Sequence, residues 1–569
     1  MDGHRVADFL VAGCAELGVR HIFGVDGANI EDVYDAVFAR AAAGLEPAVT
    51  GVVAKHEFAA ATMADGYARN SDAGIGVVAA TSGGGAMNIV AGLAESYSSR
   101  IPVLALVGQP PTALEGNGAF QDSSGRAGSL DAERLFGAVS RYCTRVEHAQ
   151  DVPWQFARAV TTAFADRGPA VLLLPKDVQQ AAVDPDPAVR PHRPKSRRDP
   201  AGLAAVLDRL VHARTAGKVV IIAGDQVGRD QARGALRALA RTLDATVGVT
   251  PDAKDAYPAR EPGYGGVAGV MGHPELVDAI RESAACLLVG TRLSVTAQPA
   301  SIAQAGTVLS LGAEEPYVAA VHADSTDLAA DLDQLRTALA RRLGDPPRRP
   351  RWVRTPGPAP LEPPSVAGPG LRYWEIVAAI SATLPEGADV VADAGNTGAA
   401  VVHYLEVPRN GRFSVALGMG GMGYSFGAGI GSAFARASCP EYRRTVVVAG
   451  DGSFFMHGME IHTAIEHRLP VTFVVLNNNA HAMCITREQL FYSDQYSFNR
   501  FRPARIGEGV AAMFPELRAC TVRTRGELAE ALRRSTEEDG PAFVAIDCDP
   551  DEIPPFVPFL ASIASRSLT

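Results

Sequence analysis

The sequence predicts an α/β protein of three domains, each a mainly parallel sheet flanked by helices. Short, continuous apolar runs alternate with Ala- and Leu-rich helical stretches along the chain, as expected for parallel strands that are buried on both faces. Two segments rich in proline and charge, 184–200 and 345–370, interrupt this alternation and favour extended linkers. The length of 569 residues also exceeds what one hydrophobic core supports.

These observations place the domains at about 1–183, 200–344 and 371–569. Four strands are expected in each domain, with helical segments between them. The expected strands are 22–25, 76–80, 103–107 and 170–175; then 219–223, 246–250, 286–289 and 308–311; then 389–392, 445–449, 471–476 and 543–546.

Composition narrows the class of partner. The net charge of −10 and pI near 5.8 argue against nucleic acid or an acidic membrane surface. No apolar run reaches the roughly 18 residues of a membrane span, and the N-terminus lacks the layout of a signal peptide. Seven scattered cysteines without a C-x-x-C pair are typical of reduced thiols. We therefore expect a cytoplasmic protein with no membrane or nucleic-acid partner.

The most informative segment is 446–483, in which two apolar strands each end in a polar cluster. The first strand ends in Gly-Asp-Gly-Ser and the second in three asparagines, and ligands bind beyond the carboxyl ends of parallel strands. Asp451, Asn478 and the carbonyl of Ala480 offer the hard oxygen atoms that Mg²⁺ prefers. The residues expected to contact a diphosphate are Gly450, Asp451, Gly452 and Ser453. The alternative is two ordinary turns that use glycine and asparagine for backbone reasons.

The GDG segment followed by NN resembles the cofactor signature of the thiamine diphosphate (ThDP)-dependent enzymes. The neighbouring sequence looks most like the branch of acetolactate synthase (acetohydroxyacid synthase) and the 2-oxoacid decarboxylases. The resemblance implies the three-domain fold of this family, with a pyrimidine-binding, a central and a diphosphate-binding domain. It also implies ThDP and Mg²⁺ as cofactors, with Asp451, Asn478 and Ala480 as the metal ligands.

The segment 55–69, KHEFAAATMADGYAR, resembles the part of the family that carries the activating glutamate. That role maps onto Glu57, whose carboxyl group would hydrogen-bond the aminopyrimidine ring of the cofactor. From chemistry alone, a glutamate at a helix start is more often a favourable charge for the helix dipole. In relatives the two halves of a site come from different subunits, which implies a homodimer or homotetramer.

Further pocket residues follow from the same resemblance. The glycine-rich segment 418–429 places Gly420 against the aminopyrimidine and Met422 beneath the cofactor, with tight helix packing as the alternative. The other expected cofactor contacts are Ser82, Asn396, Thr397 and Met483. Gln121 and His481 are the further catalytic candidates, although His481 could equally be structural. Gly27, Ala28 and Phe120 are expected to face the substrate.

The resemblance predicts an acetolactate-synthase-like carboligase that acts on a small 2-oxoacid and a carbonyl acceptor, since the paired histidines of simple pyruvate decarboxylases are absent. A non-ligating decarboxylase of a phosphono-, sulfo- or aromatic 2-oxoacid, a flavin-requiring relative and a catalytically silent paralogue remain alternatives. Segment 290–296 lacks both aspartates and the second arginine expected where FAD is seated, which makes FAD doubtful. Arg487 replaces an expected tryptophan and could clamp an anionic substrate or pair with Glu488 at the surface.

Overall fold

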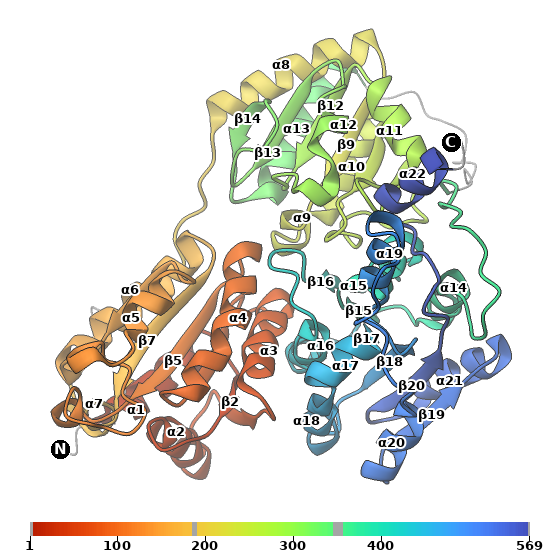
Figure 1. Ribbon diagram of the computed structural model, residues 1–569. Helices are drawn as coiled ribbons and strands as arrows, with labels where there is room; N and C mark the ends of the chain where they lie inside the picture. Colours follow the sequence, from red (N-terminus) through yellow and green to blue (C-terminus); the bar gives the residue numbers. More distant parts are fainter. Residues whose placement is uncertain (1–3, 185–189, 345–356, 567–569) are drawn as a thin grey trace.

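A computed structural model describes residues 4–184, 190–344 and 357–566. It contains three six-stranded parallel sheets flanked by helices, as the sequence predicts (Figure 1). The sheets define an N-terminal, a central and a C-terminal unit. A short antiparallel pair, β1 (His4–Arg5) with β8 (Ala182–Val183), joins the two ends of the N-terminal unit.

The N-terminal sheet has the strand order β3-β2-β4-β5-β7-β6. Its strands are β2 (His21–Val25), β3 (Thr50–Val53), β4 (Gly76–Ala80), β5 (Val103–Gln109), β6 (Tyr142–Arg145) and β7 (Pro169–Pro175). Its helices are α1 (Val6–Glu16), α2 (Glu31–Ala42), α3 (Glu57–Asn70), α4 (Gly84–Ser99), α5 (Ala132–Gly137), α6 (Val152–Ala165) and α7 (Lys176–Gln180).

The central sheet has the order β11-β10-β9-β12-β13-β14. Its strands are β9 (Val219–Ala223), β10 (Thr246–Val249), β11 (Tyr264–Val267), β12 (Ala285–Val289), β13 (Val308–Gly312) and β14 (Val321–Asp324). Its helices are α8 (Pro200–Ala216), α9 (Gln226–Arg229), α10 (Arg233–Leu243), α11 (Pro274–Arg281), α12 (Pro299–Ile302) and α13 (Leu328–Leu343).

The C-terminal sheet has the order β16-β15-β17-β18-β20-β19. Its strands are β15 (Asp389–Ala392), β16 (Phe413–Val415), β17 (Thr445–Gly450), β18 (Val471–Asn477), β19 (Arg518–Val522) and β20 (Ala542–Asp547). Its helices are α14 (Tyr373–Thr383), α15 (Gly395–Tyr404), α16 (Tyr424–Arg436), α17 (Asp451–His457), α18 (Ile461–Glu466), α19 (Ala482–Phe491), α20 (Ile506–Met513), α21 (Arg525–Glu537) and α22 (Val557–Arg566).

All twelve strands expected from the sequence are present, and each sheet adds two strands that the apolar runs did not predict. The additional strands are β3, β6, β11, β14, β16 and β19, and every one of them is an edge strand. Five of these six are partly exposed, whereas an inner strand such as β4 is buried throughout. Edge strands face water on one side, so they lack the continuous apolar run used to find the others.

Helices α3 and α16 cross where the N-terminal and C-terminal units meet (Figure 1). A β-carbon added to Gly66 would lie 2.1 Å from the backbone oxygen of Ala428, and one added to Gly431 would lie 2.0 Å from that of Met63. Because backbone faces backbone at this crossing, only glycine fits at these positions. None of the described helices has the length and apolar character needed to cross a membrane.

Candidate active site

The polar clusters after β17 and β18 lie together, because these two strands are neighbours in the sheet. Asp451 begins α17 and is only 2% exposed. Its carboxylate accepts hydrogen bonds from the backbone N–H groups of Gly452 at 2.9 Å and Ala480 at 3.1 Å. Burial raises the pKa of Asp451 to about 6, because it removes the water that would stabilise the charged carboxylate.

Asn478 provides a second buried oxygen, two residues before Ala480, whose N–H donates to the Asp451 carboxylate. Its side-chain Oδ1 has no hydrogen-bond partner, while its Nδ2 donates to the hydroxyl of Tyr373 at 3.4 Å. Buried polar atoms are rarely left unpaired. Within the described residues, no group of three or more His, Cys, Asp or Glu side chains could hold a metal. A carboxylate, an amide oxygen and the Ala480 carbonyl instead fit an ion such as Mg²⁺, which usually keeps phosphate and water ligands.

A glycine turn and the start of α15 form the neighbouring wall. A β-carbon on Gly452 would lie 2.7 Å from the His481 ring and 3.0 Å from the Met422 methyl group, and one on Gly450 would lie 3.4 Å from the Thr397 hydroxyl. Glycine therefore allows His481, Met422 and Thr397 to approach the turn. Asn396, also on α15, has a buried Oδ1 without a partner. These residues fit a diphosphate group.

Asp393 is a buried residue whose carboxylate links two helix starts, and the sequence interpretation gave it no role. It follows β15 and accepts hydrogen bonds from the Ser453 hydroxyl at 2.6 Å and from the backbone N–H groups of Gly423 and Ser425 at 3.0 Å each. One carboxylate thus fixes both α17 and the start of α16. The only available signal was an aspartate at the end of an apolar strand, which is also typical of a turn.

Glu95 of α4 holds the glycine-rich loop that carries Gly420 and Met422. Its buried carboxylate accepts N–H bonds from Gly418 at 3.1 Å, Met419 at 2.6 Å and Gly420 at 3.2 Å. Gly420 has a φ of 67°, which favours glycine. The loop position is therefore set by the N-terminal unit, a long-range contact with no local sequence signal.

The segment after the asparagines places three more candidates. His481 precedes α19, donates its backbone N–H to Asn499 at 2.9 Å and packs edge-on against Phe501. Met483 packs against the hydrophobic core. Arg487 is exposed, and in the described part of the chain it forms no ion pair with Glu488. The surface pairing considered for Arg487 is therefore not present.

The second group of candidates lies in the N-terminal unit, around Glu57. This residue begins α3, after a His56 side chain that accepts the N–H of Phe58 at 3.0 Å. The Glu57 carboxylate accepts a hydrogen bond from the amide of Asn88 at 2.8 Å. Glu57 is half-buried, so it faces a more open environment than Asp451.

Ser82 and Gln121 are linked in the same unit. The Ser82 hydroxyl donates to Gln121 at 3.2 Å and accepts from the amide of Asn29 at 2.6 Å. Gly27 lies beside them, since an added β-carbon would be 2.9 Å from the Thr81 side chain. The carbonyl of Ala28 accepts from the Lys176 ammonium group at 2.5 Å.

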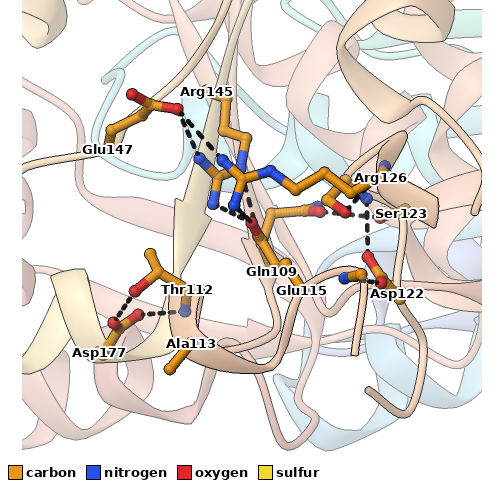
Figure 2. Close-up of polar contacts among 12 residues, drawn as sticks. Gln109, Thr112, Ala113, Glu115, Asp122, Ser123, Arg126, Arg145, Glu147 and Asp177 are labelled. Atoms are coloured by element: carbon orange, nitrogen blue, oxygen red, sulfur yellow. Dashed lines mark hydrogen bonds and ion pairs between the residues drawn. The ribbon is translucent and has the colours of Figure 1, made fainter. Parts of the chain in front are cut away.

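Ion pairs link Glu115 and Arg126, which flank Phe120 and Gln121 in sequence, to Arg145 and Glu147 (Figure 2). Arg145 contacts the fully buried carboxylate of Glu115 at 3.2 Å and Glu147 at 3.3 Å, and Arg126 approaches the same two carboxylates at 3.7 and 3.5 Å. Next to Gln121, the carboxylate of Asp122 accepts the N–H of Gly116, and the Ser123 hydroxyl donates to Gln109. The Phe120 ring itself is 80% exposed.

A direct contact joins the C-terminal unit to the segment that leads into Glu57. The buried carboxylate of Glu460 accepts the backbone N–H of Lys55 at 3.1 Å and the Thr463 hydroxyl at 2.6 Å. Burial raises the pKa of Glu460 to about 7. Among the described residues, however, no hydrogen bond or ion pair joins Glu57 to Asp451 or Asn478. Within one chain, the candidate residues therefore form two groups, one around Asp451 and one around Glu57.

Comparison with known proteins agrees with this division. Residues 4–127 match the N-terminal TPP (thiamine pyrophosphate) binding domain of the thiamine pyrophosphate enzymes, and residues 393–546 match their C-terminal TPP binding domain. Residues 203–339 match the central domain of the same enzymes. The chain belongs to the thiamine pyrophosphate enzyme family. It is a ThDP-dependent enzyme of the acetolactate-synthase-like type, as the sequence motifs predicted.

Relatives span nearly the whole chain. The probable acetolactate synthase large subunit of Methanocaldococcus jannaschii is 26% identical over 583 residues, covering 97% of this chain and 93% of that protein. The acetolactate synthase isozyme 2 large subunit of Escherichia coli is 26% identical, covering 97% of each chain. Among solved structures, the ThDP-dependent 4-hydroxybenzoylformate decarboxylase of Rhodococcus jostii RHA1 shares the fold, with a TM-score of 0.78 and 20% identity over 96% of this chain and 99% of that one.

Proposed function

We propose that the protein is a ThDP- and Mg²⁺-dependent carboligase that decarboxylates a small 2-oxoacid and transfers the acyl unit to a second carbonyl compound, giving an acyloin or 2-hydroxy-2-acyl product. The observation that carries this proposal is the buried Asp451 carboxylate beside the unpartnered Asn478 oxygen. The acetolactate synthases named above support carboligation. Bound ThDP supplies a carbon nucleophile and an electron sink for decarboxylation.

In this proposal the C-terminal unit holds the charged end of the cofactor. Asp451, Asn478 and the Ala480 carbonyl bind Mg²⁺, and the glycine turn receives the diphosphate. The residues proposed to contact the cofactor are Ser82, Asn396, Thr397, Gly420, Met422, Gly450, Gly452, Ser453 and Met483. Glu57 holds a proton at the aminopyrimidine, and Gln121 and His481 position or protonate the reacting carbonyl. Gly27, Ala28, Phe120 and Arg487 are the proposed substrate contacts.

FAD is not part of this proposed chemistry. Arg292, in the central segment where FAD-binding relatives would carry aspartates, pairs with Glu314 at 3.0 Å. Its guanidinium group also lies 4.3 Å from the centre of the Tyr317 ring. These contacts occupy the one arginine that the segment retains.

Calorimetric titration of ThDP with Mg²⁺ into the wild type and Glu57→Gln tests the assignment. We expect both proteins to bind, because Glu57 forms no hydrogen bond or ion pair with Asp451 or Asn478 among the described residues. Carbon dioxide release from a panel of 2-oxoacids should be lost by a factor of about 10² or more in Glu57→Gln, the usual contribution of a positioned acid–base group. Absence of binding in both proteins would reject a ThDP site. Release of free aldehyde without a ligated product would instead assign a non-ligating decarboxylase, and binding without turnover in the wild type would assign a silent paralogue.

We further propose that a second copy of the chain completes each site, in a homodimer or homotetramer. The support is that Glu57 and Asp451 lie in separate groups of one chain. Mixing inactive Glu57→Gln with inactive Asp451→Asn tests this arrangement. Sites shared between chains would regenerate one intact site in each mixed dimer, or about a quarter of wild-type activity on random pairing. No recovery, in subunits shown to exchange, would place each site within one chain.

A further inference from the structure

A separate cavity of about 260 Å³ lies where the three units meet, and none of the candidate active-site residues lines it. Its wall comes from the C-terminal end of α3, the residue after α4, the end of α6, α9 and the segment before β16. Six arginines line it: Arg69, Arg100, Arg167, Arg193, Arg229 and Arg412. Only two carboxylates, Asp72 and Asp230, share the wall.

Most of the carboxylates that pair with these arginines do not line the cavity. Those outside the lining are Asp65 with Arg69 at 2.6 Å, Glu314 with Arg100 at 2.8 Å, Asp225 with Arg229 at 3.3 Å and Asp255 with Arg412 at 3.0 Å. Asp230 pairs with Arg167 at 3.1 Å from within the lining. The ion pairs therefore orient the guanidinium groups, while the cavity surface remains predominantly cationic.

Several donors on these arginines have no partner. Nη2 of Arg69, Nη1 of Arg167 and Nε of Arg229 are buried nitrogen atoms without a hydrogen bond, and the buried Ser71 hydroxyl is in the same state. Leaving a buried charged donor unpaired is more unfavourable than leaving a neutral one unpaired. Together with the Asn70 Oδ1, these are five buried polar atoms without a hydrogen-bond partner on residues of one cavity wall, so the chain leaves this region unusually poorly satisfied.

The cations also oppose one another. Burial lowers the pKa of Arg100 to about 10; the charge of Glu314 raises it, while those of Arg292 and Arg229 lower it. Burial likewise lowers the pKa of Arg167 and of Arg412, with repulsion from Arg229 and Arg233 respectively. A bound anion would reverse this penalty on the charged guanidinium groups.

We propose that this cavity binds a small anion carrying phosphate groups, of about the size of inorganic pyrophosphate. Planar guanidinium groups match the paired oxygens of phosphate. The volume lies below the roughly 300–1,000 Å³ of pockets that take drug-sized ligands, which favours a small phosphate compound over a nucleotide. The anion would link α3 and α6 to α9 and Arg412, so binding would stabilise the contact between the three units.

Titration of the holoenzyme with inorganic phosphate and then pyrophosphate tests the proposal. ThDP and excess Mg²⁺ keep the diphosphate site filled, and sodium chloride at equal ionic strength controls for screening. We expect saturable binding at one site per chain and a higher melting temperature. The double variant Arg167→Gln/Arg193→Gln should bind at least tenfold more weakly.

Arg281→Gln is the matched control, because Arg281 is exposed in the central unit and pairs with Asp278 outside the cavity. It should bind as the wild type does. The single variant Arg193→Gln, at an exposed position, guards against misfolding and should still weaken binding measurably. Absence of saturable binding to the wild type, or equal affinity of wild type and double variant, would overturn the proposal.

Discussion

The two groups of candidate residues differ in how firmly the single chain holds them. Around Asp451, the carboxylates of Asp451 and Asp393 are buried and receive several backbone and hydroxyl hydrogen bonds. Around Glu57, the carboxylate is half-buried and accepts one hydrogen bond, from the exposed Asn88. The comparison teaches that the residues proposed to bind the metal are preorganised within one unit, whereas the Glu57 carboxylate lies in a more open environment.

The largest effect should follow from changing Asp451, the proposed metal ligand. Asp451→Asn keeps the size of the side chain but removes its charge, and we expect the affinity for Mg²⁺ with ThDP to fall by about 10² or more, as for lost coordination partners. Calorimetry measures this loss. Asn88→Ala, which alters the open group, should leave cofactor affinity within about tenfold. Equal losses in the two variants would contradict the contrast between the groups.

The next effect concerns the ion pair between Arg145 and Glu115, near the loop that carries Gln121. Arg145→Met leaves the Glu115 carboxylate buried with only the more distant Arg126, and breaking a buried pair in this way costs about 3–5 kcal/mol. Arg126 is 52% exposed, so Arg126→Gln should cost at most about 1 kcal/mol. Urea unfolding measures both. A smaller loss of unfolding free energy in Arg145→Met than in Arg126→Gln would show that the Arg145–Glu115 ion pair does not stabilise this loop.

A third effect should depend on pH. The pKa of Glu460 is raised from 4.5 to about 7 by burial, so the folded state holds a proton that the unfolded state releases between these values. Its stabilising contribution is therefore complete below about pH 4.5 and lost as pH rises through about 7, for up to about 3 kcal/mol. Glu460→Gln should flatten this part of the stability profile.

The exposed Glu530→Gln provides the control for Glu460, since Glu530 lies on α21 and pairs with Arg533 and Arg534. The dependence of its unfolding free energy on pH should match that of the wild type between pH 5 and 8. Denaturant unfolding at several pH values measures how the unfolding free energy of each variant changes with pH. An unchanged slope in Glu460→Gln would assign the titration to another buried carboxyl group, such as Glu552, whose pKa burial also raises to about 7.

The smallest effect concerns the contact between the two units. Gly66→Ala would place a methyl group 2.1 Å from the Ala428 oxygen, and overpacking of this kind costs about 1–3 kcal/mol. Gly526→Ala, on α21 with no atom within 4 Å of the added carbon, should be neutral or stabilising by up to about 1 kcal/mol. Thermal melts compare the two, and equal stability would contradict the close crossing of α3 and α16.

Sequence reasoning predicted the inner strands and missed the edges. Inner strands such as β17 are apolar because helices cover both faces, whereas β19 mixes arginine, cysteine and threonine and is partly exposed. The motif residues Asp451 and Asn478 were predictable because neighbouring parallel strands end at the same edge. Glu95 and Glu460 were not, because each acts on a backbone segment that lies more than 300 residues away.

The crossing of α3 and α16 also restricts how this chain can be recombined with its relatives. Contact through main-chain atoms leaves no side chain that a compensating substitution could resize. A chimera that takes residues before 184 from one enzyme and residues after 370 from another would therefore need glycine at both 66 and 431. The central unit, in contrast, could be exchanged without touching this crossing.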